Sequence, residues 1–374
     1  MHMLYPSLLR CTLLGTSLSL LTACADNHAA SQVETPTPVV QSATISLPTA
    51  VSPTSTATFE QPTQSFASWQ AAFRQEALSA GIQAAVFDAA FAGVSPDPAI
   101  IRADRSQPEF TRPVWEYLDS AISATRVRRG QALLAEHAST LQAIEQRYGV
   151  DRHALVAIWG MESNFGQYMG DKSVIAALAT LAYEGRRPAF AHEQLLAALR
   201  ILQHGDVQPS RMRGSWAGAM GQTQFMPTTY NEHAVDFDGD GRRDIWGSIP
   251  DVASSTANYL ASSGWRTGQP TYFDVTPPED AAARAKLLAP DIVPSFSADE
   301  MRALGAILPD AAMQHPGPLA LVLLENGEAA PTLIAGTQNF YAITRYNQSS
   351  YYALAVIELG QAVSQAPASS SGNP

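Results

Sequence analysis

A glutamate at the end of an apolar run is the residue best placed to do chemistry. Residues 154–159 are apolar at helical spacing, Asp151 can cap that helix, and Glu162 follows beside Trp159 and Met161. A carboxyl held against apolar side chains is poorly solvated, which raises its pKa and lets it donate a proton near neutral pH. On position alone, a solvated glutamate at a helix end is the alternative.

A glycine-rich stretch, residues 214–226, is the second candidate. Its glycines let the backbone approach a ligand closely, and Gln222 and Gln224 offer amide groups suited to sugar hydroxyls and acetamido groups. The stretch lacks the Gly-Lys-Ser/Thr ending of a phosphate-binding loop. A tight helix–helix contact that requires small residues is the alternative.

The aspartates of residues 236–247 are spaced like the start of an EF-hand calcium loop, with Gly241 at position 6. The candidate ligands are Asp236, Asp238, Asp240, Arg242 through its carbonyl, and Asp244. The match fails at position 12, where Gly247 replaces a bidentate glutamate. We therefore expect a structural calcium site weaker than a sensor site, or a sodium site, with an ion-free turn as the alternative.

Helices are the elements that must position these groups. Beyond the helix before Glu162, spacing and caps predict helices from Phe66 to Gly81, around 86–93, over 113–126, 133–148, 174–184 and 188–204, from Ser248 to Gly264, and over 350–362. His137 falls on an apolar stripe and is interpreted as a core residue. The prolines at 96–108 indicate an irregular connection.

The character of the chain changes after Gly264. Residues 270–276 and 319–325 are strand-like, and Asn326-Gly327 predicts a hairpin turn to a strand at 331–334. We interpret about 270–340 as a small β-containing subdomain, after which 341–362 rejoins the helical domain. The fold class is mainly α (α+β).

The N-terminal segment reads as a lipoprotein signal peptide, residues 1–23. Its apolar run is too short to span a membrane, and residues 21–24, Leu-Thr-Ala-Cys, resemble a lipobox, which predicts lipidation of Cys24. Cys11 would leave with the signal, so no disulfide is expected in the mature chain. An ordinary signal peptide is the alternative. Ala25 after the cysteine favours the outer membrane.

Composition restricts the remaining choices. Residues 24–65, rich in Ser, Thr and Pro, predict a disordered tether, and 363–374 a disordered tail. With 374 residues and 46% hydrophobic content, the chain can bury a large core. A net charge of −11 argues against nucleic acid as a partner, because a phosphate backbone requires a basic surface.

Five motifs in order resemble the membrane-bound lytic murein transglycosylase B family across about residues 66–362. They are Glu-Ser-Asn-Phe-Gly at 162–166, the glycine-rich motif at 217–227, the aspartate motif at 235–241, Ala-Asn-Tyr-Leu at 257–260, and Asn-Phe-Tyr-Ala-Ile-Thr-Arg-Tyr-Asn at 339–347. The resemblance implies a goose-lysozyme-like helical catalytic core with a small antiparallel β subdomain. It also implies cleavage of peptidoglycan glycan strands.

Carried over by position, the resemblance makes Glu162 the single catalytic acid/base. The substrate-binding residues that it implies are Ser215 and Gln224 in the cleft, with Tyr117, Arg186, Arg187, Tyr259, Tyr346 and Asn347 as glycan- or peptide-contacting positions. It further implies cleavage between N-acetylmuramic acid and N-acetylglucosamine to a 1,6-anhydromuramyl end. No cofactor is needed for that reaction.

Two other functions remain open on the sequence. A hydrolytic muramidase would use water on the same fold, with a second carboxylate to assist it. A non-enzymatic, calcium-dependent wall-binding lipoprotein would use the aspartate loop and the tether. In each case we expect peptidoglycan as the partner and a lipid anchor at the periplasmic face of the outer membrane of a Gram-negative bacterium. Other cell-wall enzymes are further candidate partners.

Overall fold

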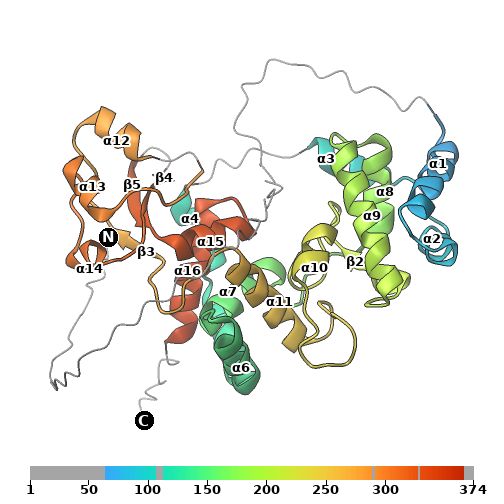
Figure 1. Ribbon diagram of the computed structural model, residues 1–374, viewed down its shortest axis with the longest axis horizontal. Coiled ribbons are helices and arrows are strands. Elements are labelled where there is room, and N and C mark those ends of the chain that lie inside the picture. Colours follow the sequence, from blue (N-terminus) through green and yellow to red (C-terminus); the bar gives the residue numbers. More distant parts are fainter. Residues whose placement is uncertain (1–63, 107–112, 289–290, 327–328, 366–374) are drawn as a thin grey trace, which may run out of the picture. The chain divides into compact units, whose positions relative to one another are not determined.

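The computed structural model describes residues 64–106, 113–288, 291–326 and 329–365 (Figure 1). The expected signal peptide lies outside these residues, as do nearly all of the expected tether and most of the expected tail. The Asn326-Gly327 turn lies partly outside them. In the part of the chain that is described, no helix is both long enough and apolar enough to cross a membrane.

Helices make up most of the described chain. They are α1 (Phe66–Ser79), α2 (Ala84–Ala90), α3 (Pro98–Arg105), α4 (Val114–Ala121), α5 (Ala124–Glu136), α6 (Ala138–Tyr148), α7 (Arg152–Ser163), α8 (Val174–Glu184), α9 (Pro188–His204), α10 (Pro227–His233), α11 (Ile249–Ser262), α12 (Ala281–Leu287), α13 (Ala298–Ala303), α14 (Asp310–Met313), α15 (Gln338–Tyr346) and α16 (Ser350–Ser364). The strands are β1 (Lys172–Ser173), β2 (Arg213–Gly214), β3 (Tyr272–Asp274), β4 (Ala320–Asn326) and β5 (Ala329–Gly336).

Helix α7 lies in the middle of the main core. It packs against α5, α6, α11 and α16, and its residues 155–160 are all buried. Two glycines permit this close packing. A Cβ at Gly160 would lie 2.7 Å from the ring of Phe165, and a Cβ at Gly130 on α5 would lie 2.7 Å from the side chain of Val363 on α16. The continuous apolar run at 154–159 is thus explained by burial of α7 on several sides.

Helices α8 and α9 form as the sequence predicts. The hydroxyl of Ser173 accepts a hydrogen bond from the backbone N–H of Ala176 and caps α8. Pro188 occupies the first turn of α9, and Gly205 ends that helix in a left-handed conformation. The two helices pack side by side, and α8 also contacts α3.

The region interpreted as a β-containing subdomain holds a three-stranded sheet. Strands β3 and β4 flank β5 in an antiparallel sheet, with Phe273 opposite Ala335 and Val322 opposite Ile334. A second, smaller core lies on this sheet and includes Leu287, Met301 and Leu321. It is covered by α12, α13 and α14 (Figure 1), three short helices that the sequence analysis did not predict.

Several predicted boundaries were wrong. The helix over 113–126 breaks at Ile122, because the hydroxyl of Ser123 accepts the N–H of Arg126 and begins α5. The single helix over 133–148 is instead the end of α5 and all of α6, which meet at His137 without a side-chain cap on α6. The connection at 96–108 contains α3, because Asp97 caps it and a proline fits its first turn.

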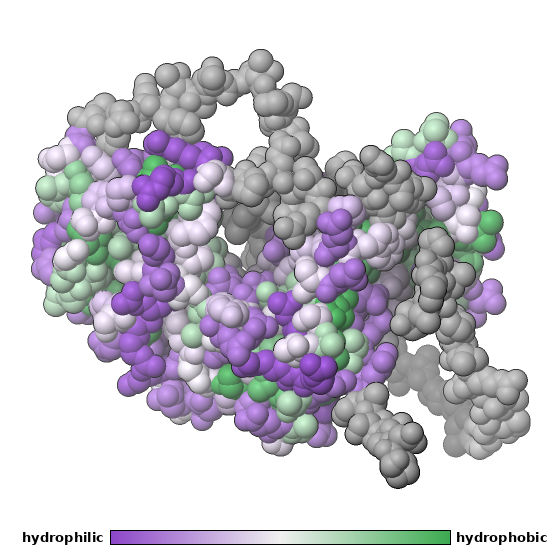
Figure 2. Space-filling model, turned by 180° about the vertical axis from the view of Figure 1, so that it is seen from behind, coloured by the Kyte–Doolittle hydropathy of each residue, from purple (hydrophilic) through white to green (hydrophobic). Residues whose placement is uncertain are grey.

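The surface is mixed in polarity. On the face shown in Figure 2, hydrophilic residues cover much of the described surface, with smaller apolar areas among them. This is ordinary for a globular protein. The chemistry must therefore be sought in particular side chains.

Candidate active site

Glu162 lies in the last turn of α7, where the helix ends at Asn164 in a left-handed conformation. Its carboxyl is drawn into the interior, and Oε1 accepts a hydrogen bond of 2.6 Å from the hydroxyl of Tyr352 on α16. The partner is 190 residues away in the sequence, so the pair exists only because α7 and α16 pack together.

Burial raises the pKa of Glu162 from 4.5 to about 7, while the hydrogen bond from Tyr352 lowers it and offsets part of the shift. Removing the carboxyl from water disfavours its charged form, whereas a donated hydrogen bond favours it. Among the described residues, no charged side chain contributes to this pKa shift. The expectation of a poorly solvated acid at the end of the apolar helix is therefore confirmed.

Three tyrosines lie within the electrostatic influence of this carboxyl: Tyr117 on α4, Tyr346 on α15 and Tyr352 on α16. The pKa of each is raised by burial first and then by the negative charge of Glu162. The hydroxyl of Tyr346 donates to the backbone oxygen of Thr223 at 2.7 Å. The sequence analysis named Tyr117 and Tyr346 but missed Tyr352, because no local pattern shows that α16 turns this face toward Glu162.

The glycine-rich loop, residues 214–226, is joined to the site by hydrogen bonds that differ from those expected. Gln222 is buried. Its Oε1 accepts from Trp159 Nε1 at 2.7 Å, and its Nε2 donates to the backbone oxygen of Trp246 at 2.9 Å. Both ends of this amide are occupied within the protein. Gln222 therefore holds the loop against α7 and is a structural residue.

Gln224 and Ser215 also contact the backbone. Gln224 has a left-handed backbone (φ 51°), and its Nε2 donates to the carbonyls of Gly221 at 2.8 Å and Met169 at 3.2 Å. The hydroxyl of Ser215 accepts the N–H groups of Ala217 and Ala219. Both side chains are only partly buried. They shape the loop, and their exposed sides are available to a ligand.

The other predicted contact residues lie in two groups. Tyr259 packs its ring 5.0 Å from that of Tyr346 and donates its hydroxyl to the carbonyl of Arg345, which places it in the same aromatic cluster. Asn347 is exposed at the end of α15.

The two arginines belong to the second group. The backbone N–H and Nε of Arg186 both donate to Asp104 on α3, and the guanidinium of Arg187 lies over the ring of Phe190. Within the described residues, the contacts found for these arginines are with α3 and the start of α9 and do not reach Glu162.

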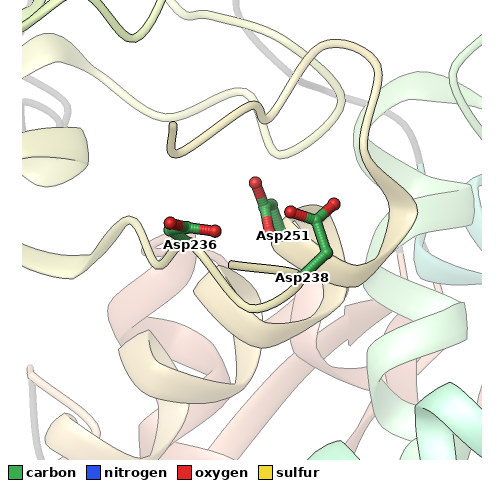
Figure 3. Close-up of side chains that lie close together, drawn as sticks. All are labelled: Asp236, Asp238 and Asp251. Carbon is green, nitrogen blue, oxygen red and sulfur yellow. The ribbon is translucent and has the colours of Figure 1, made fainter. Parts of the chain in front are cut away.

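The aspartate loop gathers a different set of carboxylates from the predicted one. Ligand oxygens of Asp236, Asp238 and Asp251 lie within 4.8 Å of one another, and Figure 3 shows the three side chains close together. Asp251 stands in the first turn of α11, beyond the twelve-residue loop pattern, and the sequence analysis missed it as a ligand. Three carboxylates this close suit a hard cation such as calcium.

The remaining predicted ligands are used within the loop. Asp240 accepts the N–H of Arg242 at 2.8 Å, and Asp244 accepts those of Trp246 and Gly247 at 2.9 Å each. Ser248 begins α11 as the sequence predicts, because its hydroxyl accepts the N–H of Asp251. The carboxylate of Asp251 in turn accepts the N–H groups of Phe237 and Asp244.

Comparisons with known proteins agree with this architecture. Residues 65–361 match the transglycosylase SLT domain family. Membrane-bound lytic murein transglycosylase B of Escherichia coli K12 is 34% identical over 255 residues, which are 67% of each chain. SltB3 of Pseudomonas aeruginosa, solved with NAG-anhNAM-pentapeptide, is 56% identical at a TM-score of 0.73, covering 80% of each chain. Escherichia coli Slt35, solved with calcium, is 29% identical at a TM-score of 0.68, covering 79% of this chain and 92% of that one.

A mainly helical, lysozyme-like core that holds one half-buried acid defines an enzyme of glycan cleavage. The chain belongs to the transglycosylase SLT domain family. Its activity is lytic transglycosylation of peptidoglycan, a lyase reaction on a polysaccharide.

Proposed function

We propose that Glu162 is the single general acid and base of this reaction. The observation that carries the proposal is the buried carboxyl with a pKa near 7 and a hydroxyl partner from Tyr352. A group with this pKa is protonated in part at neutral pH and can act in both directions. Burial and the hydrogen bond from Tyr352 account for its pKa shift, so one carboxyl with a hydroxyl partner supports the proposal.

The proposed reaction balances without water. Glu162 gives its proton to the glycosidic oxygen between N-acetylmuramic acid and N-acetylglucosamine, and the bond from the anomeric carbon to that oxygen breaks. The acetamido group of the substrate stabilises the developing cation. The resulting carboxylate takes the proton of the muramyl 6-hydroxyl as its oxygen bonds to the anomeric carbon. The product is a 1,6-anhydromuramyl end, and Glu162 is again protonated.

The tyrosines favour this internal attack by position. Tyr352 fixes the carboxyl by its 2.6 Å hydrogen bond, and Tyr117 and Tyr346 lie near enough for the charge of Glu162 to raise their pKa values. Holding the 6-hydroxyl near the anomeric carbon gives it the advantage of an intramolecular reactant over water. A hydrolytic muramidase would instead use a second carboxylate near Glu162 to assist the attack of water.

Substrate contacts extend from this centre. We assign Ser215 and Gln224 to the cleft beside the scissile bond, and Tyr117, Tyr259, Tyr346 and Asn347 to sugar contacts around it. Arg186 and Arg187 are assigned to more distant contacts, because their exposed guanidinium groups can pair with carboxylates of the peptide stems.

A structural calcium ion is proposed at Asp236, Asp238 and Asp251. The three carboxylates supply hard oxygen ligands, and burial followed by the nearby charge of Asp238 raises the pKa of Asp251, as expected for acids crowded without a cation. A calcium ion there would hold the loop against α11. No catalytic step passes through it.

Anchoring is proposed at Cys24. The lipobox at 21–24 and the Ser/Thr/Pro-rich segment 24–65 support a lipid anchor at the periplasmic face of the outer membrane, with a tether that lets the enzyme reach the wall. Labelling of the wild-type chain with a fatty acid, and its loss in Cys24→Ser, is the expected result. Equal labelling of both chains would contradict the anchor.

Replacing Glu162 with glutamine tests the central assignment. Glu162→Gln keeps an acceptor for Tyr352 but cannot transfer a proton, so turnover of purified peptidoglycan should fall by roughly 10² to 10⁴-fold while binding remains. Glu358→Gln is the matched control, because Glu358 on α16 also accepts a tyrosine hydroxyl, that of Tyr272, at 3.0 Å. Near-normal turnover in Glu162→Gln would refute the assignment.

A further inference from the structure

An exposed tyrosine stands on the loop that follows Glu162 and has no part in the proton transfers. Tyr168 is 73% exposed, more than any other large hydrophobic side chain among the described residues. Single exposed aromatic residues are common on protein surfaces, so exposure alone assigns no role. The loop that carries Tyr168, residues 164–170, supplies the further observations.

This loop is held in one conformation. Asn164 and Phe165 both have left-handed backbones, with φ of 48° and 59°, which is unusual for residues other than glycine. The N–H of Tyr168 donates to the carbonyl of Ser163 at 2.9 Å, next to Glu162. Such backbone conformations persist only where the surroundings enforce them. The backbone that carries Tyr168 is therefore fixed before any ligand arrives.

The loop also joins the glycine-rich loop. Gln224 donates to the carbonyl of Met169 at 3.2 Å. A Cβ on Gly170 would lie only 2.1 Å from the carbonyl oxygen of Gly214, so the two backbones are in contact. Tyr168 is thus placed beside the end of α7 on one side and beside the segment of Ser215 and Gln224 on the other.

We propose that Tyr168 is a glycan-binding residue whose ring stacks on a sugar of the peptidoglycan strand, next to the sugars that flank the scissile bond. The inference rests on the proposed role of Glu162. A pyranose ring has an apolar C–H face and a polar edge, which match the face and the hydroxyl of a tyrosine. A tyrosine has only two side-chain torsions, so on a fixed backbone its ring loses little entropy on binding and its contact area contributes to affinity.

The position of Tyr168 predicts that its removal affects long substrates more than short ones. Tyr168 lies six residues after Glu162, on the loop that follows α7, so it supplies binding and no proton transfer. Long strands that reach the ring should lose affinity when it is removed. Fragments too short to reach it should be cleaved at an unchanged rate.

Full-length enzyme in detergent tests this with three variants. Tyr168→Ala should raise KM for long glycan strands about tenfold, with the change in KM exceeding that in kcat, because a tenfold change corresponds to the loss of an aromatic contact worth about 1.4 kcal/mol. Tyr168→Phe keeps the ring and should stay close to wild type. Ile307→Ala is the control, because Ile307 is similarly exposed, at 69%, and its backbone pairs with Thr276 in the β-containing region, away from the loop of Tyr168.

Binding without turnover separates this inference from the proposed function. In a Glu162→Gln background, adding Tyr168→Ala should reduce retention on insoluble peptidoglycan about tenfold. Equal retention with and without the tyrosine ring would overturn the role of Tyr168 and leave Glu162 untouched. A wild-type chain that binds but does not cleave would instead overturn the role of Glu162, while the retention comparison would still decide on Tyr168.

Discussion

Glu162 and Asp251 are both interior carboxyls, but their surroundings differ. Glu162 is half-buried and accepts one hydroxyl hydrogen bond, from Tyr352. Asp251 is fully buried, its two oxygens accept backbone N–H groups of Phe237 and Asp244, and two further carboxylates lie close by. Burial raises the pKa of both. A single carboxyl with a raised pKa can exchange a proton with a substrate. Three carboxylates close together instead favour binding of a cation.

The largest expected effect on stability concerns Glu162 and pH. The native state keeps this proton up to about pH 7, whereas the unfolded chain releases it near 4.5, so the native state loses stability as pH rises between these values. The complete penalty, present above pH 7, is at most about 3 kcal/mol.

Glu162→Gln removes this penalty. The variant should match wild type in free energy of unfolding at pH 4 and exceed it at pH 8, measured by urea unfolding at both values. If the difference in free energy of unfolding between the variant and the wild type is the same at both pH values, the carboxyl is not protonated up to neutral pH. Glu358→Gln should show no such gain.

The second effect concerns Asp251. Asp251→Asn places an amide where a carboxylate oxygen accepts a backbone N–H, leaving a buried donor without its acceptor at a cost of about 1–3 kcal/mol. The rise in Tm on adding calcium should also shrink, because a ligand is lost. Asp240→Asn is the control, since Asp240 is exposed and outside the gathered set.

Calcium titrations monitored by Tm distinguish the two ligand sets. The proposed calcium site predicts that the rise in Tm on adding calcium persists in Asp240→Asn and shrinks in Asp251→Asn. The reverse pattern would support Asp240 of the twelve-residue loop as a ligand and contradict Asp251.

The smallest expected effect concerns the hydroxyl of Tyr352. Its hydrogen bond stabilises the charged carboxylate and lowers the pKa of Glu162. In Tyr352→Phe this pKa should therefore rise, and the alkaline limb of the kcat/KM profile should move to higher pH. Tyr272→Phe, which removes the hydroxyl bonded to Glu358, should leave the limb in place. A limb that moves to lower pH in Tyr352→Phe would contradict the assigned hydrogen bond.

The sequence predicts what is encoded locally. The apolar run before Glu162 is enough to foresee a buried helix, and Ser173 and Pro188 mark the starts of α8 and α9. Local patterns also gave wrong helix boundaries, because the apolar spacing continues through Ile122 and His137 although the helices end there. Caps such as that of Ser123 decide these boundaries and leave the apolar pattern unchanged.

The partners of each carboxyl lie beyond local patterns. Tyr352 meets Glu162 from 190 residues away, through the packing of α16 on α7. Asp251 meets Asp236 because α11 folds back onto the loop, which a twelve-residue motif does not describe. The amide of Gln222 suits sugar hydroxyls by its chemistry, but it is used by Trp159 and Trp246. Tertiary packing decides which polar groups face a ligand.

Mass spectrometry of the products from purified peptidoglycan tests the central claim most directly. The proposed use of Glu162 as both acid and base predicts 1,6-anhydromuramyl ends from the wild-type chain and their loss in Glu162→Gln. Reducing muramyl ends from the wild-type chain would contradict it, because they require water as the nucleophile and a different role for the carboxyl.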